Sequence, residues 1–192
     1  LGDVYKRQAY TMIGAVQKNV GSVNEDFSFT NDIITNRIIT VTKSGNNISD
    51  YNDLSGKKLA VVTDIAKAAL DKNATIKNNN KNTLYPTIED ALSALDNGSV
   101  DAVITDEFNF SPLENAEKYQ VLNGELDKIS YAFMFKKGDW VVENWNEAIY
   151  ELKSPDYNDK DEFTPMVEKY FGYNASSFDY AVSYTHLTLP TI

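Results

Sequence analysis

Cysteine is absent from the 192-residue chain, and histidine occurs once, at His186. Without cysteine the chain forms no disulfide bond, no thiolate nucleophile and no cysteine-based metal site. The formal net charge is -10 and no stripe of lysine and arginine is present, which argues against a nucleic-acid partner. No apolar run approaches the roughly 20 residues that a membrane-spanning helix needs. What remains is a globular chain, whose apolar fraction of 42% is enough to build a core.

The two ends of the chain are related through their possible codons. GAT-GTG-TAT-AAG-AGA-CAG encodes Asp3 to Gln8, and its reverse complement, read in a shifted frame, encodes Val182 to His186. Residues 1–8 and 182–192 thus resemble translated transposon adapters, and such segments are set aside before a fold is considered. We therefore expect a native segment of about residues 9–181, with no histidine and with any export signal upstream.

Apolar runs and helical spacings alternate along this segment. Strands are predicted by the apolar or β-branched runs at 11–16, 36–42, 59–62, 100–104 and 129–135. Helices are predicted by the spacing of apolar residues over 65–70, 88–95, 140–152 and 166–171. Thr87 is expected to cap the second helix, and the polar stretch 78–82 predicts a surface loop. This alternation predicts an α/β fold with two sheets and two crossings between them.

Five short motifs occur along the chain in a particular order. They are Gly14 followed by Asp26-Phe27-Ser28, Leu54-Ser55-Gly56-Lys57, a helix followed by Gly98, Asp101-Ala102 and Asp106, then Phe135-Lys136-Lys137-Gly138, and last Glu168 to Gly172. In this order they resemble the family-3 bacterial extracellular solute-binding proteins, which are two-lobed, hinge-bending amino-acid binders. The resemblance covers nearly all of residues 10–172.

The resemblance implies a type II periplasmic-binding-protein-like architecture with two lobes. Residues 9–42 would end the first segment of lobe 1, residues 43–130 would form lobe 2, and residues 131–181 would return to lobe 1. The N-terminal part of lobe 1 would be missing. The ligand would lie in the cleft between the lobes.

The resemblance also places a ligand site. Asp106 matches the residue that receives the ligand's ammonium group, and the lobe 2 turn that donates backbone N–H groups reads Asp64-Ile65-Ala66. In lobe 1, Ala15 to Lys18 follow the Gly14 element, with Val16 and Lys18 where the family has threonines. Gly21 stands where the family has the arginine that clamps the ligand carboxylate bidentately.

The missing arginine bears on the ligand. Its loss from a desolvated pocket would cost a free carboxylate several kcal/mol, by order of magnitude, unless another cation replaces it. Lys18 and Arg37 are the candidates, and for both a surface or hinge position is the simpler interpretation. An amine, a peptide fragment or a small polar molecule without a carboxylate fits Val16 and Asp106 at least as well as an amino acid does.

No cofactor or metal is expected. Asp156, Asn158, Asp159, Asp161 and Glu162 suggest calcium, but Lys160 occupies a ligand position and the glycine of an EF-hand loop is missing. A solvated acidic loop is the simpler interpretation.

Three classes of function remain open. The favoured one is a monomeric, extracytoplasmic receptor, free or lipid-anchored, that binds a small molecule and delivers it to an ABC permease. The alternative is the ligand-sensing extracellular domain of a membrane signalling protein. An enzyme on this fold is disfavoured, because without a native histidine or cysteine only carboxylates such as Asp106 or Glu107, or a lysine, could act as acid or base.

Overall fold

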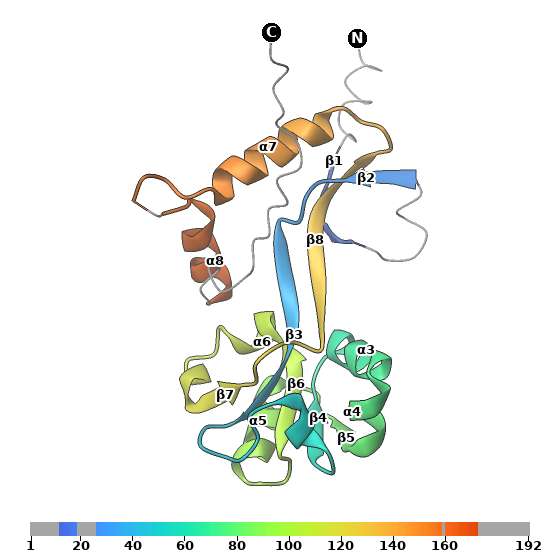
Figure 1. The fold of residues 1–192 in the computed structure, drawn as a ribbon, viewed down its shortest axis with the longest axis vertical. Coiled ribbons are helices and arrows are strands. Elements are labelled where there is room, and N and C mark those ends of the chain that lie inside the picture. Colours follow the sequence, from blue (N-terminus) through green and yellow to red (C-terminus); the bar gives the residue numbers. More distant parts are fainter. Residues whose placement is uncertain (1–11, 19–25, 159, 173–192) are drawn as a thin grey trace.

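The computed structural model describes residues 12–18, 26–158 and 160–172. The elements in chain order are β1 (Met12–Gln17), β2 (Phe27–Phe29), β3 (Ile34–Lys43), η1 (Tyr51–Leu54), β4 (Lys58–Val61), α3 (Asp64–Lys72), α4 (Ala74–Asn79), β5 (Lys81–Leu84), α5 (Ile88–Asp96), β6 (Ala102–Asp106), α6 (Glu107–Phe110), η2 (Ala116–Lys118), β7 (Tyr119–Val121), β8 (Asp127–Lys136), α7 (Val141–Lys153) and α8 (Phe163–Phe171). Strands β4–β7 and helices α3–α6 gather in one unit, called lobe 2, whereas β1, β2, α7 and α8 gather in another, called lobe 1 (Figure 1).

Strands β3 and β8 connect the two lobes. They run antiparallel side by side, from the pair Ile34–Tyr131 to the pair Ile38–Asp127. Beyond Ile38, β3 pairs with β6 and β7 of lobe 2. Beyond Ser130, β8 pairs with β1 and β2 of lobe 1. The paired strands therefore form the crossing that is visible between the lobes in Figure 1.

The expectation of two separate sheets needs a correction. Strands β1–β8 form one hydrogen-bonded sheet in the order β1-β8-β3-β6-β4-β5, with β2 against β8 and β7 against β3. The sheet is continuous because β3 and β8 are each ten residues long and exchange one partner for another along their length.

Alternation along the buried strands of lobe 2 builds a core on both faces of the sheet. Successive strand residues point to opposite faces. In β4, Leu59 and Val61 belong to a cluster with α3 and α4, whereas Ala60 and the following Val62 belong to a cluster with α5. This explains the near-continuous apolar runs of β4 and β6, since a parallel strand covered on both faces has no solvent side.

Lobe 1 has a smaller core. Phe163 and Val167 of α8 are buried, with Leu152 of α7 and the residues Ile33 and Ile34 packed against them. Trp145 of α7 meets the ring of Phe133 edge-on at 4.8 Å between ring centroids. Helix α8 thus packs against α7 and against the start of β3.

The stretch 78–82, predicted as a surface loop, was assigned wrongly. It contains the end of α4 and the start of β5. Strand β5 pairs in parallel with β4, although all four of its residues are exposed. Its polar composition hid an edge strand, because the side chains of such a strand face solvent while its backbone hydrogen bonds hold it in place.

Candidate ligand site

The lobe 1 residues of the expected site lie at the end of β1. Strand β1 runs antiparallel to β8, so its last residues lie beside Tyr131 and Ala132, where β8 leaves the hinge. Ala15 is exposed and Val16 is half-buried. The backbone N–H of Lys18 donates to the carbonyl of Ser130 at 2.9 Å. Gly21 lies outside the described residues.

Lys18 is engaged within lobe 1. Its Nζ lies 2.7 Å from Asp32 Oδ1 and 3.3 Å from the carbonyl oxygen of Thr30. Burial by itself raises the pKa of Asp32, but hydrogen bonds from Lys18 and Ser130 and the positive charges of Lys18 and Lys153 outweigh it and lower that pKa. The ammonium group of Lys18 therefore already has a counter-charge within the protein.

The lobe 2 residues 64–66 begin helix α3. Thr63 caps the helix, its Oγ1 accepting the N–H of Ala66 at 3.2 Å. Ala66 is fully buried in the core, Ile65 is half-buried, and the side chain of Asp64 is exposed. Among these three side chains, Asp64 is thus the one open to a ligand.

Asp106 ends β6 and caps the short helix α6. Its Oδ1 accepts from the Asn36 side chain at 3.1 Å and from the backbone N–H of Asn109 at 3.2 Å. Its Oδ2 accepts from the Asn109 side chain at 2.7 Å, and the residue is 1% exposed. Burial and the charge of Asp106 raise the pKa of the neighbouring Tyr131. A ligand ammonium would have to displace Asn109 to reach this carboxylate.

Arg37 on β3 forms a forked ion pair with Glu107, the residue after Asp106. Arg37 Nε and Nη2 donate to the two carboxylate oxygens at 2.9 and 2.6 Å. The Glu107 side chain is 7% exposed, so the pair is largely shielded from water. The sequence indicates Glu107 only as a carboxylate that could act as acid or base. Its pairing with Arg37 was missed, because local patterns contain no signal for a partner 70 positions away.

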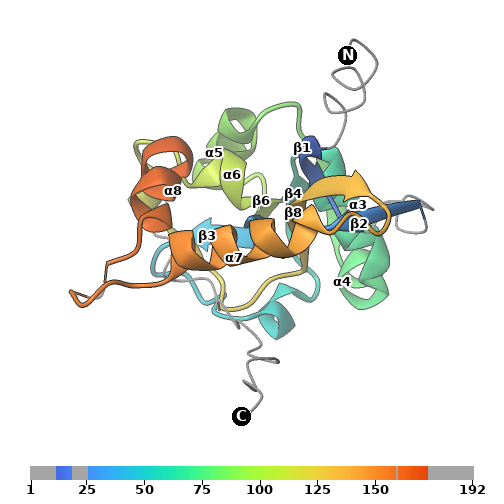
Figure 2. The same ribbon diagram turned by 90° about the horizontal axis from the view of Figure 1, so that it is seen from above.

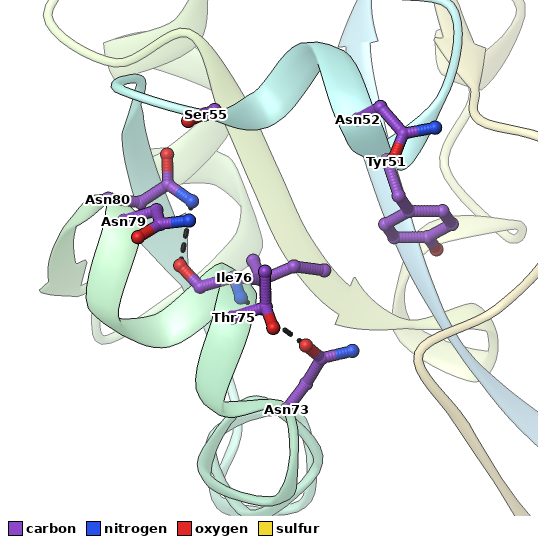
Figure 3. A pocket seen from close by; sticks show the side chains of 8 residues that line it. All are labelled: Tyr51, Asn52, Ser55, Asn73, Thr75, Ile76, Asn79 and Asn80. Atoms are coloured by element: carbon purple, nitrogen blue, oxygen red, sulfur yellow. Dashed lines mark hydrogen bonds between the residues drawn. The ribbon is translucent and has the colours of Figure 1, made fainter.

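A groove of about 420 Å³ lies elsewhere on lobe 2, between η1 and α4 (Figure 3). Its lining is mostly polar and comprises Tyr51, Asn52, Ser55, Asn73, Thr75, Ile76, Asn79 and Asn80. The oxygen of the Asn73 side chain accepts the N–H of Ile76, and the Asn80 side chain donates to the Ile76 carbonyl. These amides therefore serve α4 itself, and the groove contains none of the residues expected in the ligand site.

Two further observations concern metals and membranes. Asp156 Oδ1 accepts the backbone N–H groups of Asn158 and Lys160 at 2.8 and 3.0 Å. These hydrogen bonds, above all the one from Lys160, lower the pKa of Asp156. No cluster of three or more potential ligands that could hold a metal ion occurs among residues 12–18, 26–158 and 160–172. Within the same residues, every helix is too short or too polar to span a bilayer.

Comparison with solved structures establishes the class of fold. A substrate-binding protein of a polar amino acid ABC uptake transporter from Streptococcus thermophilus superimposes with a TM-score of 0.68 at 22% identity, over 88% of this chain and 66% of that one. The second of the substrate-binding domains assigned to an amino-acid ABC transporter of Streptococcus pneumoniae superimposes with a TM-score of 0.63 at 24% identity, over 88% of this chain and 76% of that one. The chain therefore has the two-lobed, type II periplasmic-binding-protein-like fold.

A third neighbour is a ligand-binding core whose description names no ABC transporter. It is the GluR0 ligand-binding core from Nostoc punctiforme in complex with L-glutamate, with a TM-score of 0.53 at 21% identity, over 88% of this chain and 76% of that one. No family model matches the chain, and no curated protein matches it by sequence. The likeness thus rests on three-dimensional structure.

Proposed function

We propose that the chain is the solute-binding component of an ABC importer, working outside the cytoplasm on a small polar ligand. The observation that carries the proposal is the pair of long strands β3 and β8, which join two lobes and allow them to hinge. Solved structures of amino-acid ABC transporter binding proteins with the same fold support it. Lobe boundaries near residues 42 and 130 are part of this proposal, as are a monomeric state and the lack of a nucleic-acid partner.

We place the ligand between the end of β1 and the start of α3. The lining residues would be Ala15, Val16, Lys18 and Gly21 from lobe 1, and Asp64, Ile65, Ala66 and Asp106 from lobe 2. Because Asp106 is buried and bonded while Asp64 is exposed, Asp64 is the carboxylate better placed to meet a cationic ligand first.

The ligand class follows from the charges that are already paired. Lys18 is neutralised by Asp32 and Arg37 by Glu107, so neither offers a free clamp for a carboxylate. Breaking the shielded Arg37–Glu107 pair to bind a ligand leaves an uncompensated charge, which costs about 3–5 kcal/mol. Breaking the more exposed Lys18–Asp32 pair costs up to about 1 kcal/mol. We therefore propose an amine without a free α-carboxylate.

Matched pairs of ligands test this proposal by thermal unfolding. Arginine against agmatine, and lysine against cadaverine, differ only in the α-carboxylate. A ligand at a hundredfold its Kd adds about 2.7 kcal/mol to stability, which is about 5–10 °C for a chain of this size. We expect the amine of a pair to raise the melting temperature and Asp64→Asn to weaken its binding up to about fivefold. A strong shift with the amino acid of each pair would show that a carboxylate clamp exists.

A sensing domain is the second candidate, and the GluR0 ligand-binding core among the neighbours favours it. The intact reading frame in the source DNA separates the two. A membrane-spanning segment followed by a signalling domain would exclude the importer component.

Enzymatic activity is not part of the proposal. The two carboxylates that would serve as acid or base, Asp106 and Glu107, are held by Asn36 and Asn109 and by Arg37. A general acid or base must be able to form a hydrogen bond with a substrate proton, whereas these two carboxylates already accept hydrogen bonds from side chains of the protein.

A further inference from the structure

The lobes touch on the side of the hinge opposite to α3. Figures 1 and 2 show α3 and α4 on one side of β3 and β8, and α6 and α8 on the other. Across that second side, the ring of Phe108 in lobe 2 lies 4.4 Å from the ring of Phe171 in lobe 1, measured between centroids. Phe108 also stacks at 6.2 Å on Tyr131 of β8. An aromatic contact thus links the end of α8 to lobe 2.

Helix α6 holds Phe108 rigidly to the hinge strand β3. Asn36 of β3 accepts the backbone N–H of Phe108 at 3.2 Å and donates to the capping carboxylate of Asp106. The next residue of β3, Arg37, holds Glu107 through its fork. These bonds anchor both residues that precede Phe108, so the ring moves with β3 and lobe 2.

Gly172 brings the backbones of the two lobes together. It ends α8 with φ +70°, and a Cβ there would lie 2.8 Å from Pro112 Cα and 3.1 Å from the Ser111 carbonyl oxygen. A left-handed backbone alone favours glycine. At Gly138, which has φ +75°, the same conformation leaves nothing within 4 Å of an added Cβ. Gly172 therefore also permits the close approach of α8 to lobe 2.

We propose that this contact between α8 and the segment Phe108–Pro112 is an interlobe stop, which stabilises the open arrangement and separates when the lobes close over a ligand. A rotation about the paired strands that closes the α3 side must open the opposite side. The contact therefore sets how often the unliganded protein closes, and through that fraction its apparent affinity. The inference rests on the proposed function, since it assigns the regulation of that site.

The absence of cysteine allows a direct test by site-specific labelling. Spin labels at Glu143→Cys on α7 and Lys67→Cys on α3 report the distance between the lobes by pulsed electron paramagnetic resonance, without ligand. Gly172→Ala should push the contact apart and raise the population of short distances by about fivefold, the effect of a modest change in free energy. Gly138→Ala, with equal backbone strain and no contact between lobes, should leave the distribution unchanged.

A second variant keeps the proposal testable if Gly172→Ala does not fold. Phe108→Leu keeps an apolar side chain against Tyr131 but loses the ring contact with Phe171, and should shift the distances in the same direction. The stop is excluded if Gly172→Ala gives the distribution of Gly138→Ala, or if Phe108→Leu lengthens the distances. The distance measurement uses no ligand, so its result does not depend on the ligand screen. A failed ligand screen would contradict the proposed function without deciding whether the interlobe stop exists.

Discussion

At the scale of single residues, the partner of each charge decides its role. Lys18 and Arg37 are equivalent candidates in the sequence, but Lys18 meets Asp32 within lobe 1, whereas Arg37 on β3 meets Glu107 at the start of α6. Both acidic partners are distant in the sequence from the bases they hold. In the proposed site these two pairs leave neither base free to clamp a ligand carboxylate.

Lys153 should give the stability of the protein a measurable pH dependence. Burial lowers its pKa from 10.5 to about 8, with the charge of Asp32 opposing part of the effect. Between these two values the unfolded chain keeps a proton that the folded chain has lost, so the stability contribution of Lys153 rises with pH. Lys153→Met removes a partly buried ammonium group, so we expect it to have a higher free energy of unfolding than the wild type at pH 7. This difference should fall by about 1 kcal/mol from pH 7 to pH 10, after allowance for partial exposure.

Urea unfolding at both pH values measures this difference. Lys153→Arg is the matched control, because arginine keeps its charge throughout the range. The free energy of unfolding of Lys153→Arg should therefore fall further below that of the wild type as the pH rises. A difference that is independent of pH in both variants would show that Lys153 keeps its ordinary pKa.

Removing one charge of the shielded pair should be costly. Glu107→Gln leaves the Arg37 guanidinium without its counter-charge and should lower the free energy of unfolding by about 3 kcal/mol. Asp71→Asn removes a carboxylate from an exposed pair with Lys77 and should have no measurable effect, because water screens it. Equal effects of the two variants in denaturant unfolding would contradict the shielding of Glu107.

At the scale of elements, prediction succeeded where apolar spacing and a cap agree. Helix α5 begins after Thr87, whose Oγ1 accepts the N–H of Asp90 at 3.1 Å, and its apolar face is buried. Strands β3, β4, β6 and β8 were predicted from their apolar or β-branched runs. The short elements β2, β5, β7 and α6 were missed, because three or four residues carry too little periodicity to be recognised.

The cap of α5 provides a test at this scale. Thr87→Ala leaves one N–H group of the first turn without its acceptor and should cost about 1 kcal/mol. Ser93→Ala on the exposed face of the same helix is the control and should be neutral or slightly stabilising, since alanine favours helix. Denaturant midpoints that move equally in both variants would show that the cap contributes nothing.

At the scale of the whole molecule, the two lobes differ in the size of their cores. Lobe 2 has two clusters, one on each face of its sheet, whereas α8 contributes two buried side chains, Phe163 and Val167, to a smaller cluster in lobe 1. Local stability follows buried apolar contact. The two lobes are therefore expected to unfold locally and independently of each other.

Hydrogen exchange detected by mass spectrometry checks this expectation. Amides of β4 and β6 should exchange slowest and those of β1 and α8 fastest. Phe163→Ala should speed exchange in α7 and α8 and leave β4 and β6 unchanged, while Leu59→Ala should do the reverse. Uniform acceleration by either variant would mean that the chain unfolds as one cooperative unit.

The sequence by itself determined the alternation of strands and helices, the main strands and helices, and the absence of thiol chemistry, because periodicity and composition act locally. The two-lobed class of fold was indicated by the order of its short motifs. Only the tertiary structure decided which charges are paired, that Asp106 is a buried cap, and that Gly172 lies against Pro112. The contacts of Arg37 with Glu107, Asn36 with Asp106 and Gly172 with Pro112 join residues 60 or more positions apart, and even Lys18 and Asp32 are 14 positions apart. Local sequence patterns contain no information about such distances.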